Sequence, residues 1–385
     1  RAHHPKISAQ NVRLTLLLTA ALLVWPIAAL LAVLLERGYT RALRREKTFR
    51  AGRAFAFMLA CYVPMFCVAF PGSFAYDVPY QLRQVVTGAY STHHPLLHTL
   101  ALGGLLQLGR ALGDINLGAA LYTALQMALL AGCFALTCGS IARQSGARAA
   151  KRAAVFFALY PLNMVMAVNA TKDVLFGGFF ALTLALLNEI QEKPSRGLAL
   201  KIAACGALAV MLRNNMAYAA LVWLAILTIG LRKGEKSAAL AMLLALAVGL
   251  CGNAALKRAT RAESGDMSEM LSWPIQQLAR ARLYDEERLT DAEKEAIDEL
   301  MPGEAWACYD PTISDPVKFE FDTQAFRADV KKYVGVWLSV GKKCAGTYLD
   351  ATMALTYPFF YPYREYRVSG YYVQMGMSDA YDAGW

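Results

Sequence analysis

The chain has 385 residues, of which 57% are hydrophobic and 18% charged, and its formal net charge is +10. A mean hydropathy of +0.33 and this low charge content exclude an ordinary soluble globular domain, in which about 25% of residues are charged. The basic residues fall in short loops between apolar runs. They therefore indicate orientation in a membrane, and no nucleic-acid partner is expected.

In chain order, the apolar runs predict about eight membrane-spanning helices, since a span needs about 20 apolar residues. These lie at 12–35, 54–70, 115–142, 149–168, 174–190, 198–213, 215–231 and 237–257. We therefore expect an all-α, polytopic membrane protein with a transmembrane domain over 1–257 and an extracytoplasmic, mainly helical domain over 258–385. Further spans beyond either end are also an expectation, because the sequence starts at Arg1.

Four basic loops fix the predicted orientation. They lie at 37–53, 143–152, 193–201 and 232–236, and the excess of Lys and Arg in cytoplasmic loops places all four inside. The loop that follows the span 54–70 is then outside and the loop at 143–152 is inside, so the chain crosses the membrane only once between them. The apolar segment 96–112 is therefore expected to lie as an interfacial helix in the first external loop.

The region after the last span carries helix and turn signals. Thr290 and Glu293 match a capping box at a helix start, Pro302-Gly303 ends that helix, and 324–356 predicts one longer helix. An aromatic-rich run, 357–372, follows. Cys308 and Cys344 also lie in this region, and the sequence leaves open whether they pair or stay as thiols.

Ionisable and aromatic residues gather in the three predicted external loops. The first loop carries Tyr76, Asp77, Tyr80, His93 and His94, the second Lys172 and Asp173, and the third Arg213 and Asn214. A partly desolvated carboxylate can deprotonate a hydroxyl, and Lys or Arg can hold a phosphate. Interfacial anchoring is the alternative for the two basic residues, and an Asx-turn is the alternative for Asp77.

The pattern resembles the GT-C superfamily of membrane glycosyltransferases. The resemblance rests on 71–77, on His93-His94-Pro95 and on the Lys172-Asp173 pair that opens a span. It continues in 272–277, 309–311 and 314–318. It implies a GT-C-like helix bundle that transfers a sugar from a polyprenyl-phosphate donor to an envelope glycan, lipid or protein acceptor.

The same resemblance implies roles for the loop residues. Asp77 is the expected catalytic base and Asp173 a second catalytic carboxylate. Lys172 and Arg213 are expected at the donor phosphate. The expected substrate-binding residues are Tyr76, Tyr80, His93, His94 and Asn214.

Other readings remain beside the transferase. No cofactor is certain, and a divalent cation (Mg or Mn) is an open alternative, although the adjacent pair His93-His94 is poorly placed to chelate one ion. A transporter or flippase of a lipid-linked saccharide is the alternative function, but it predicts ionisable groups near the bilayer midplane. The expected location is the inner or plasma membrane of a bacterium, with membrane lipids as partners and an extracytoplasmic active site.

Overall fold

The structure, a computed structural model, describes residues 48–75, 77–229 and 233–356. The predicted span at 12–35 and the aromatic run at 357–372 lie outside these residues. The described chain divides between Ser264 and Gly265 into two compact units, one over 48–264 and one over 265–356. Each unit is built around its own core, and each is described by itself.

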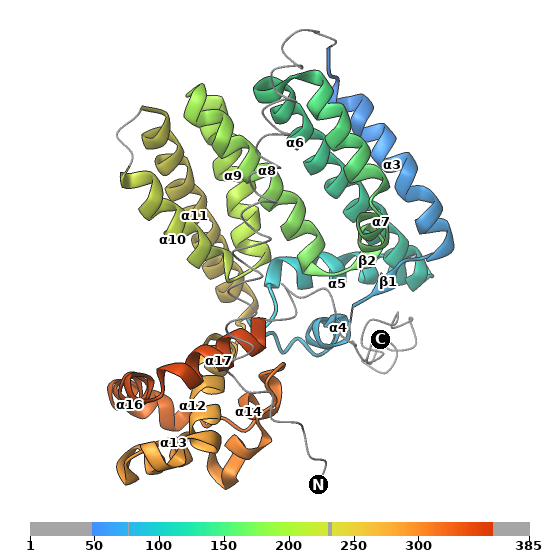
Figure 1. Cartoon of the computed structure of the whole chain (residues 1–385). Helices are drawn as coiled ribbons and strands as arrows, with labels where there is room; N and C mark the ends of the chain where they lie inside the picture. Colours follow the sequence, from blue (N-terminus) through green and yellow to red (C-terminus); the bar gives the residue numbers. More distant parts are fainter. Residues whose placement is uncertain (1–47, 76, 230–232, 357–385) are drawn as a thin grey trace. The chain divides into compact units, whose positions relative to one another are not determined.

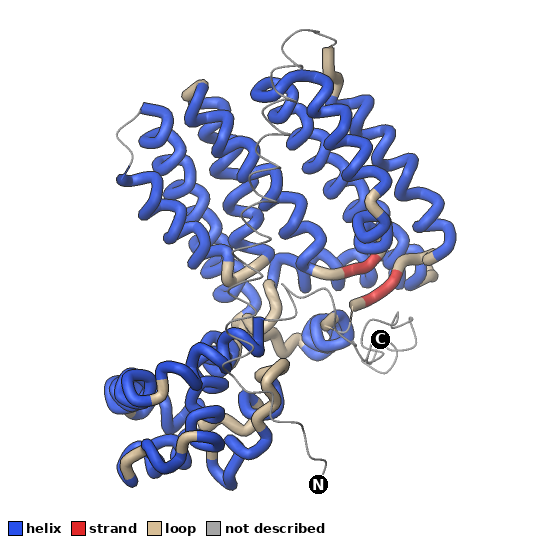
Figure 2. The backbone as a smooth tube through the Cα atoms, viewed as in Figure 1, coloured by secondary structure: helices blue, strands red, loops and turns tan. Residues whose placement is uncertain are grey.

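The first unit is helical, with one short pair of strands (Figures 1 and 2). Its elements are α3 (Ala51–Val68), β1 (Ser73–Phe74), α4 (Val78–Thr87), α5 (Leu96–Ala111), α6 (Ile115–Leu159), α7 (Pro161–Ala167), β2 (Asn169–Ala170), α8 (Lys172–Glu192), α9 (Arg196–Leu212), α10 (Met216–Ile229) and α11 (Lys233–Thr260). The predicted spans after residue 53 all fall on helices. The helix predicted over 96–112 is α5.

Four helices of the described chain are long and apolar enough to cross a membrane. They are α3, α6, α8 and the stretch Gly234–Thr260 of α11, and their composition is that of a membrane protein. The helices predicted as two further spans are shorter: α9 has 17 residues and α10 has 14. Length and composition therefore support four of the predicted spans directly.

Helix α6 folds back on itself at Gly146. Gly146 has φ +85° and ψ +164°, which is not helical, and a positive φ of this kind suits glycine. The rings of Phe134 and Phe157 stack with centroids 4.2 Å apart. In a straight helix these residues would lie about 35 Å apart, because each residue rises about 1.5 Å. The two predicted spans 115–142 and 149–168 are therefore two arms of a helical hairpin. The second arm ends at Leu159, where Pro161 starts α7.

Helices α5 and α6 cross at two glycines that touch. A Cβ on Gly109 would lie 2.2 Å from the backbone nitrogen of Gly118, and a Cβ on Gly118 would lie 2.4 Å from the carbonyl oxygen of Leu105. No side chain fits at either position. The crossing brings the buried face of α5, including Leu102 and Leu106, against α6.

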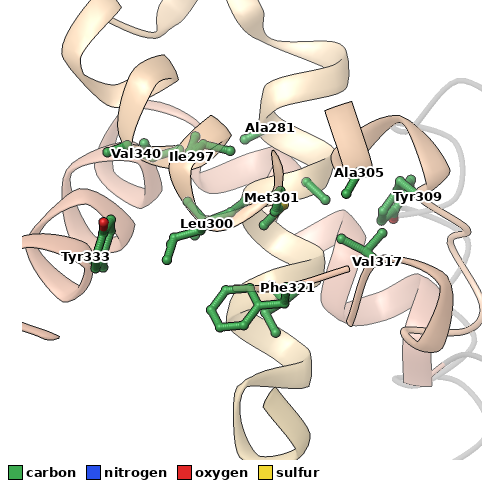
Figure 3. Close-up of a cluster of buried hydrophobic side chains, with 14 of the residues drawn as sticks. Ala281, Ile297, Leu300, Met301, Ala305, Tyr309, Val317, Phe321, Tyr333 and Val340 are labelled. Carbon is green, nitrogen blue, oxygen red and sulfur yellow. The ribbon is translucent and has the colours of Figure 1, made fainter. Parts of the chain in front are cut away.

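The second unit contains η2 (Met267–Leu271), α12 (Ser272–Tyr284), η3 (Glu286–Arg288), α13 (Asp291–Leu300), η4 (Pro302–Cys308), α14 (Asp315–Lys318), α15 (Thr323–Ala328), α16 (Val330–Lys343) and α17 (Ala345–Thr356). Its core is a cluster of aliphatic and aromatic side chains. Ile297, Leu300, Met301 and Val317 lie inside it, as Figure 3 shows. Two of the segments on which the family resemblance rests, 272–277 and 309–311, contact each other in this unit. The side-chain amide of Gln276 donates to the carbonyl oxygens of Asp310 at 3.1 Å and Ile313 at 2.6 Å.

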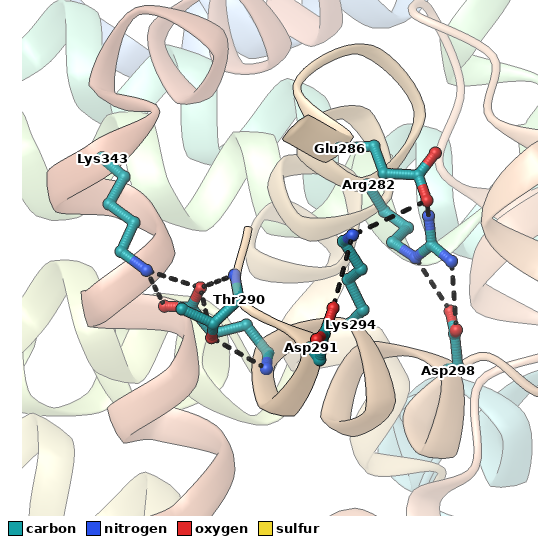
Figure 4. Close-up of polar contacts among 8 residues, drawn as sticks. Arg282, Glu286, Thr290, Asp291, Lys294, Asp298 and Lys343 are labelled. Carbon is teal, nitrogen blue, oxygen red and sulfur yellow. Dashed lines mark hydrogen bonds and ion pairs between the residues drawn. The ribbon is translucent and has the colours of Figure 1, made fainter. Parts of the chain in front are cut away.

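The capping box predicted at Thr290 is confirmed. The Thr290 hydroxyl accepts from the Glu293 backbone N–H, and the Glu293 carboxylate accepts from the Thr290 backbone N–H at 2.8 Å. The same carboxylate accepts from Lys343 Nζ at 2.7 Å (Figure 4). Desolvation favours the neutral acid, but these bonds outweigh it and lower the pKa of Glu293 to about 2.

The prediction of one long helix over 324–356 is wrong. The chain forms α15, α16 and α17, with breaks at Asp329 and Cys344. Asp329 is non-helical (φ −147°), and its carboxylate caps α16 by accepting from the Lys332 N–H at 2.9 Å. The apolar spacing alone could not show this local cap. Cys344 is buried, Cys308 is exposed, and both are free thiols in the structure.

Candidate functional site

A two-residue parallel pairing brings the first two predicted loops together. Ser73 of β1 pairs with Asn169 of β2, and Phe74 pairs with Ala170. Parallel strands leave their pairing in the same direction. Asp77, three residues after β1, and Lys172, two residues after β2, therefore emerge side by side.

Asp77 and Lys172 form an ion pair, with the Lys172 ammonium donating to Oδ2 of Asp77. The side chains are only 17% and 16% exposed, respectively. Nδ1 of His94 lies 3.8 Å from the same carboxylate oxygen. Asp77 precedes α4, yet its side chain makes no capping hydrogen bond. The Asx-turn alternative is therefore not what the structure shows, and the carboxylate faces the cation and the imidazole.

A second ion pair lies one residue further along the chain. Arg213 pairs with Asp173, and both side chains are 41% exposed. Arg213 also lies over the Phe176 ring, 5.7 Å from its centroid. Thr171 caps α8, and Asp173 stands in the first turn of that helix, where the helix dipole favours an acid. Because Lys172 and Asp173 are consecutive residues, the Asp77–Lys172 and Asp173–Arg213 ion pairs lie next to each other.

The neighbouring histidines differ in environment. His93 is exposed and His94 is buried, and their rings meet edge to face with centroids 4.5 Å apart. Burial lowers the pKa of His94 to about 4. Asp77 opposes this shift by raising the pKa, whereas Lys172 and His93 lower it further. At neutral pH His94 is thus an uncharged imidazole beside the Asp77 carboxylate.

The third loop reaches the first through Asn214. Its side-chain amide donates to the Thr92 carbonyl oxygen at 3.3 Å. The Thr92 backbone N–H in turn donates to the Glu263 carbonyl oxygen at 2.9 Å, so the segment before His93 is held from two sides. Tyr80 is exposed on α4, and Tyr76 lies outside the described residues. The structure therefore gathers Asp77, His93, His94, Lys172, Asp173, Arg213 and Asn214 at one end of the first unit.

A buried polar network beside these residues was not predicted from the sequence. Nδ1 of His98 lies 2.8 Å from Oε1 of Gln81, and Nε2 lies 2.8 Å from the Tyr122 hydroxyl. That hydroxyl also lies 3.1 Å from Oε1 of Gln126. All four side chains are at most 2% exposed, and burial lowers the pKa of His98 to about 3.

Gln126 links this network to the site. Its amide nitrogen donates to the carbonyl oxygens of Ala167 at 3.0 Å and Asn169 at 2.9 Å. Those carbonyls belong to the stretch that ends at Lys172. The sequence signal for this network was Gln126, a glutamine inside the apolar run 115–142. A buried amide needs hydrogen-bond partners, so its presence there indicates a buried polar network.

No group of three or more His, Cys, Asp or Glu side chains that could hold a metal ion occurs in the part of the chain that the structure describes. At the candidate site, Nδ1 of His94 lies 3.8 Å from Oδ2 of Asp77, which gives two ligand-type side chains side by side.

A family model matches residues 86–383 of the chain, and its description is "Family of unknown function (DUF6020)". The match covers more than half of the 385 residues, so the chain belongs to this family. No curated protein matches the chain, and no solved structure matches it.

Proposed function

For this member of the DUF6020 family, we propose a polytopic membrane glycosyltransferase of the GT-C type. It transfers a sugar from a polyprenyl-phosphate donor to an acceptor hydroxyl on the outer face of the membrane. The observation that carries the proposal is a pair of adjacent ion pairs from three separate stretches of chain. The shielded carboxylate of Asp77 pairs with Lys172, and Arg213 pairs with Asp173, the residue that follows Lys172. Sugar transfer from a lipid phosphate needs this combination of a base and phosphate ligands.

The sidedness follows from the ends of the helices. The helices concerned are α3, the two arms of α6, α8, α9 and α11. Each of them has one end at a basic loop and the other end toward the candidate site. The excess of Lys and Arg favours a cytoplasmic position for the basic loops, which supports a site on the outer face. In a chain whose native cysteines are replaced by serine, membrane-impermeant thiol reagents should label Ser91→Cys but not Arg148→Cys in intact cells, and the reverse pattern would contradict this orientation.

The proposed step is a direct displacement. Asp77 takes the proton of the acceptor hydroxyl, the acceptor oxygen bonds to the anomeric carbon, and the bond from that carbon to the phosphate oxygen breaks. Polyprenyl phosphate leaves with the electron pair. Arg213 is the more exposed cation and can bind the phosphate with two parallel N–H groups, while Lys172 orients Asp77 and lies within reach of the same phosphate.

The neutral His94 and the neighbouring ion pair shape the surroundings of the base. An uncharged imidazole next to Asp77 leaves the carboxylate without a second positive partner at neutral pH. Asp173 holds Arg213 in place through their ion pair. His93 and Asn214 are exposed at the site, and the acceptor and the sugar are proposed to bind there, with the exposed Tyr80 of α4 as a further proposed contact.

The test uses the full chain in lipid nanodiscs, a polyprenyl-phosphate donor with a radiolabelled hexose, and an envelope extract as acceptor. Covalent label on the acceptor is the expected result. Asp77→Asn should lower turnover per folded molecule by about 100-fold or more, the usual contribution of a general base. Arg83→Gln, an exposed residue of α4 outside the proposed machinery, is the matched control and should keep wild-type turnover.

Two outcomes would count against the proposal. Equal turnover of Asp77→Asn and wild type would remove Asp77 from the mechanism. Label that crosses the membrane of sealed vesicles without becoming bound to an acceptor would instead indicate a transporter of lipid-linked saccharide.

A further inference from the structure

A second feature of the first unit lies far from the candidate site along α3, at the opposite helix end. A cavity of about 340 Å³ opens where α3 begins, beside the second arm of α6. This volume falls in the range of small-molecule sites, about 300–1,000 Å³. Its lining includes Arg50, Arg53, Phe57, Lys151 and Val155.

The charged residues of this lining are all cationic. Arg50, Arg53 and Lys151 contribute three positive charges, and no acidic residue belongs to the described lining. None of the three forms an ion pair with another described residue, whereas Arg143, at the hairpin end of α6, pairs with Glu189. Three cations that have no ion-pair partner among the described residues surround one cavity, and this arrangement favours an anionic ligand.

The start of α3 adds to this positive field. Arg50 precedes the helix without a capping hydrogen bond from its side chain, and the first turn carries no acidic residue. The first backbone N–H groups of a helix have no partner within it, and with the helix dipole they favour an anion at this point. The helix dipole at the start of α3 therefore adds to the positive charge of the side chains that line the cavity.

Two apolar residues of the lining, Phe57 and Val155, lie one helical turn deeper than the cations. Phe57 follows Arg53 by four residues on α3, and Val155 follows Lys151 by four residues on α6. Residues four apart lie on the same face of a helix, about 6 Å along its axis. Both side chains are exposed, and α3 and α6 are among the helices apolar enough to cross a membrane. The ligand must therefore be anionic at one end and apolar at the other.

We propose that this cavity binds an anionic phospholipid. Its phosphate lies among Arg50, Arg53 and Lys151, and an acyl chain runs along Phe57 and Val155. The ligand is structural or regulatory and is independent of the proposed transferase site.

The test measures lipid retention by the full chain in detergent, by native mass spectrometry with phosphatidylglycerol as the probe. Detergent removes the charged bilayer surface, so retention reports the site itself. The double variant Arg53→Gln/Lys151→Gln should retain phosphatidylglycerol about tenfold less well or worse, because charge-assisted hydrogen bonds to the phosphate are lost. Both side chains are exposed, so folding should be unaffected, as the thermal midpoint in detergent would show.

The matched control is Arg148→Gln/Arg152→Gln, which removes the same charge from exposed positions of the same α6 arm outside the lining. It should retain phosphatidylglycerol as the wild type does. Phosphatidylcholine should not be retained, and 10-fold excess inorganic phosphate should not displace phosphatidylglycerol. Equal loss in both double variants would show diffuse attraction to basic loops, and displacement by inorganic phosphate would show a site for free phosphate. Either result overturns the proposal.

Discussion

The contrast between the two neighbouring ion pairs gives a quantitative prediction. The Asp77–Lys172 pair is mostly shielded, at 17% and 16% exposure, whereas Asp173 and Arg213 are both 41% exposed. Two unit charges about 4 Å apart attract by about 4 kcal/mol at an effective dielectric constant of about 20 and by about 1 kcal/mol in water. The shielded pair should thus couple more strongly than the exposed pair.

The perturbations are Asp77→Asn, Lys172→Met and the double variant. Removing one partner of a shielded pair leaves the other charge without compensation, which costs about 3–5 kcal/mol when burial is complete. Because some solvent reaches these side chains, we expect about 3 kcal/mol for each single variant. The double variant should cost less than the sum, with a coupling free energy of about 2 kcal/mol.

The assay is unfolding of the full chain by SDS in mixed micelles, followed by circular dichroism. The matched cycle uses Asp173→Asn, Arg213→Met and their double variant, for which the coupling should stay below about 1 kcal/mol, as for exposed ion pairs. Additive effects at Asp77 and Lys172, or a larger coupling in the exposed pair, would refute the reasoning from burial.

Three further predictions concern the rest of the chain. His94 and His98 have folded pKa values of about 4 and 3, below an unfolded value of about 6.5. The unfolded state therefore takes up protons first as pH falls. Stability is full above pH 6.5 and should fall by about 4 kcal/mol on going to pH 5, and a constant unfolding free energy over this range would contradict the burial of these rings. Gly109→Ala should destabilise the chain by at least about 2 kcal/mol because its Cβ meets backbone atoms, whereas Gly104→Ala, with open space around it, should not. Similar thermal midpoints for these two variants would disprove the close helix crossing. Glu293→Gln should cost about 2 kcal/mol at pH 7. Because the folded pKa of Glu293 is about 2, the difference should shrink as pH falls from about 4.5, and a difference independent of pH would exclude the charge as its cause.

The sequence by itself determined the apolar helices of the first unit, the capping box at Thr290 and the chemical character of the loops. These features depend on local composition. An apolar run of sufficient length forms a helix in a membrane, and a Thr followed three residues later by Glu satisfies the first N–H groups of a helix wherever that helix lies.

The tertiary structure alone decided what the loops do together. The pairing of Ser73 with Asn169 sets Asp77 against Lys172 across 95 residues of chain. The breaks at Asp329 and Cys344 divide the apolar pattern over 324–356, which predicted one helix, into α15, α16 and α17. Hydropathy averages over many residues, whereas one backbone conformation or one buried hydrogen bond, such as that between Tyr122 and His98, depends on atoms that are distant in sequence and meet only after the chain has packed.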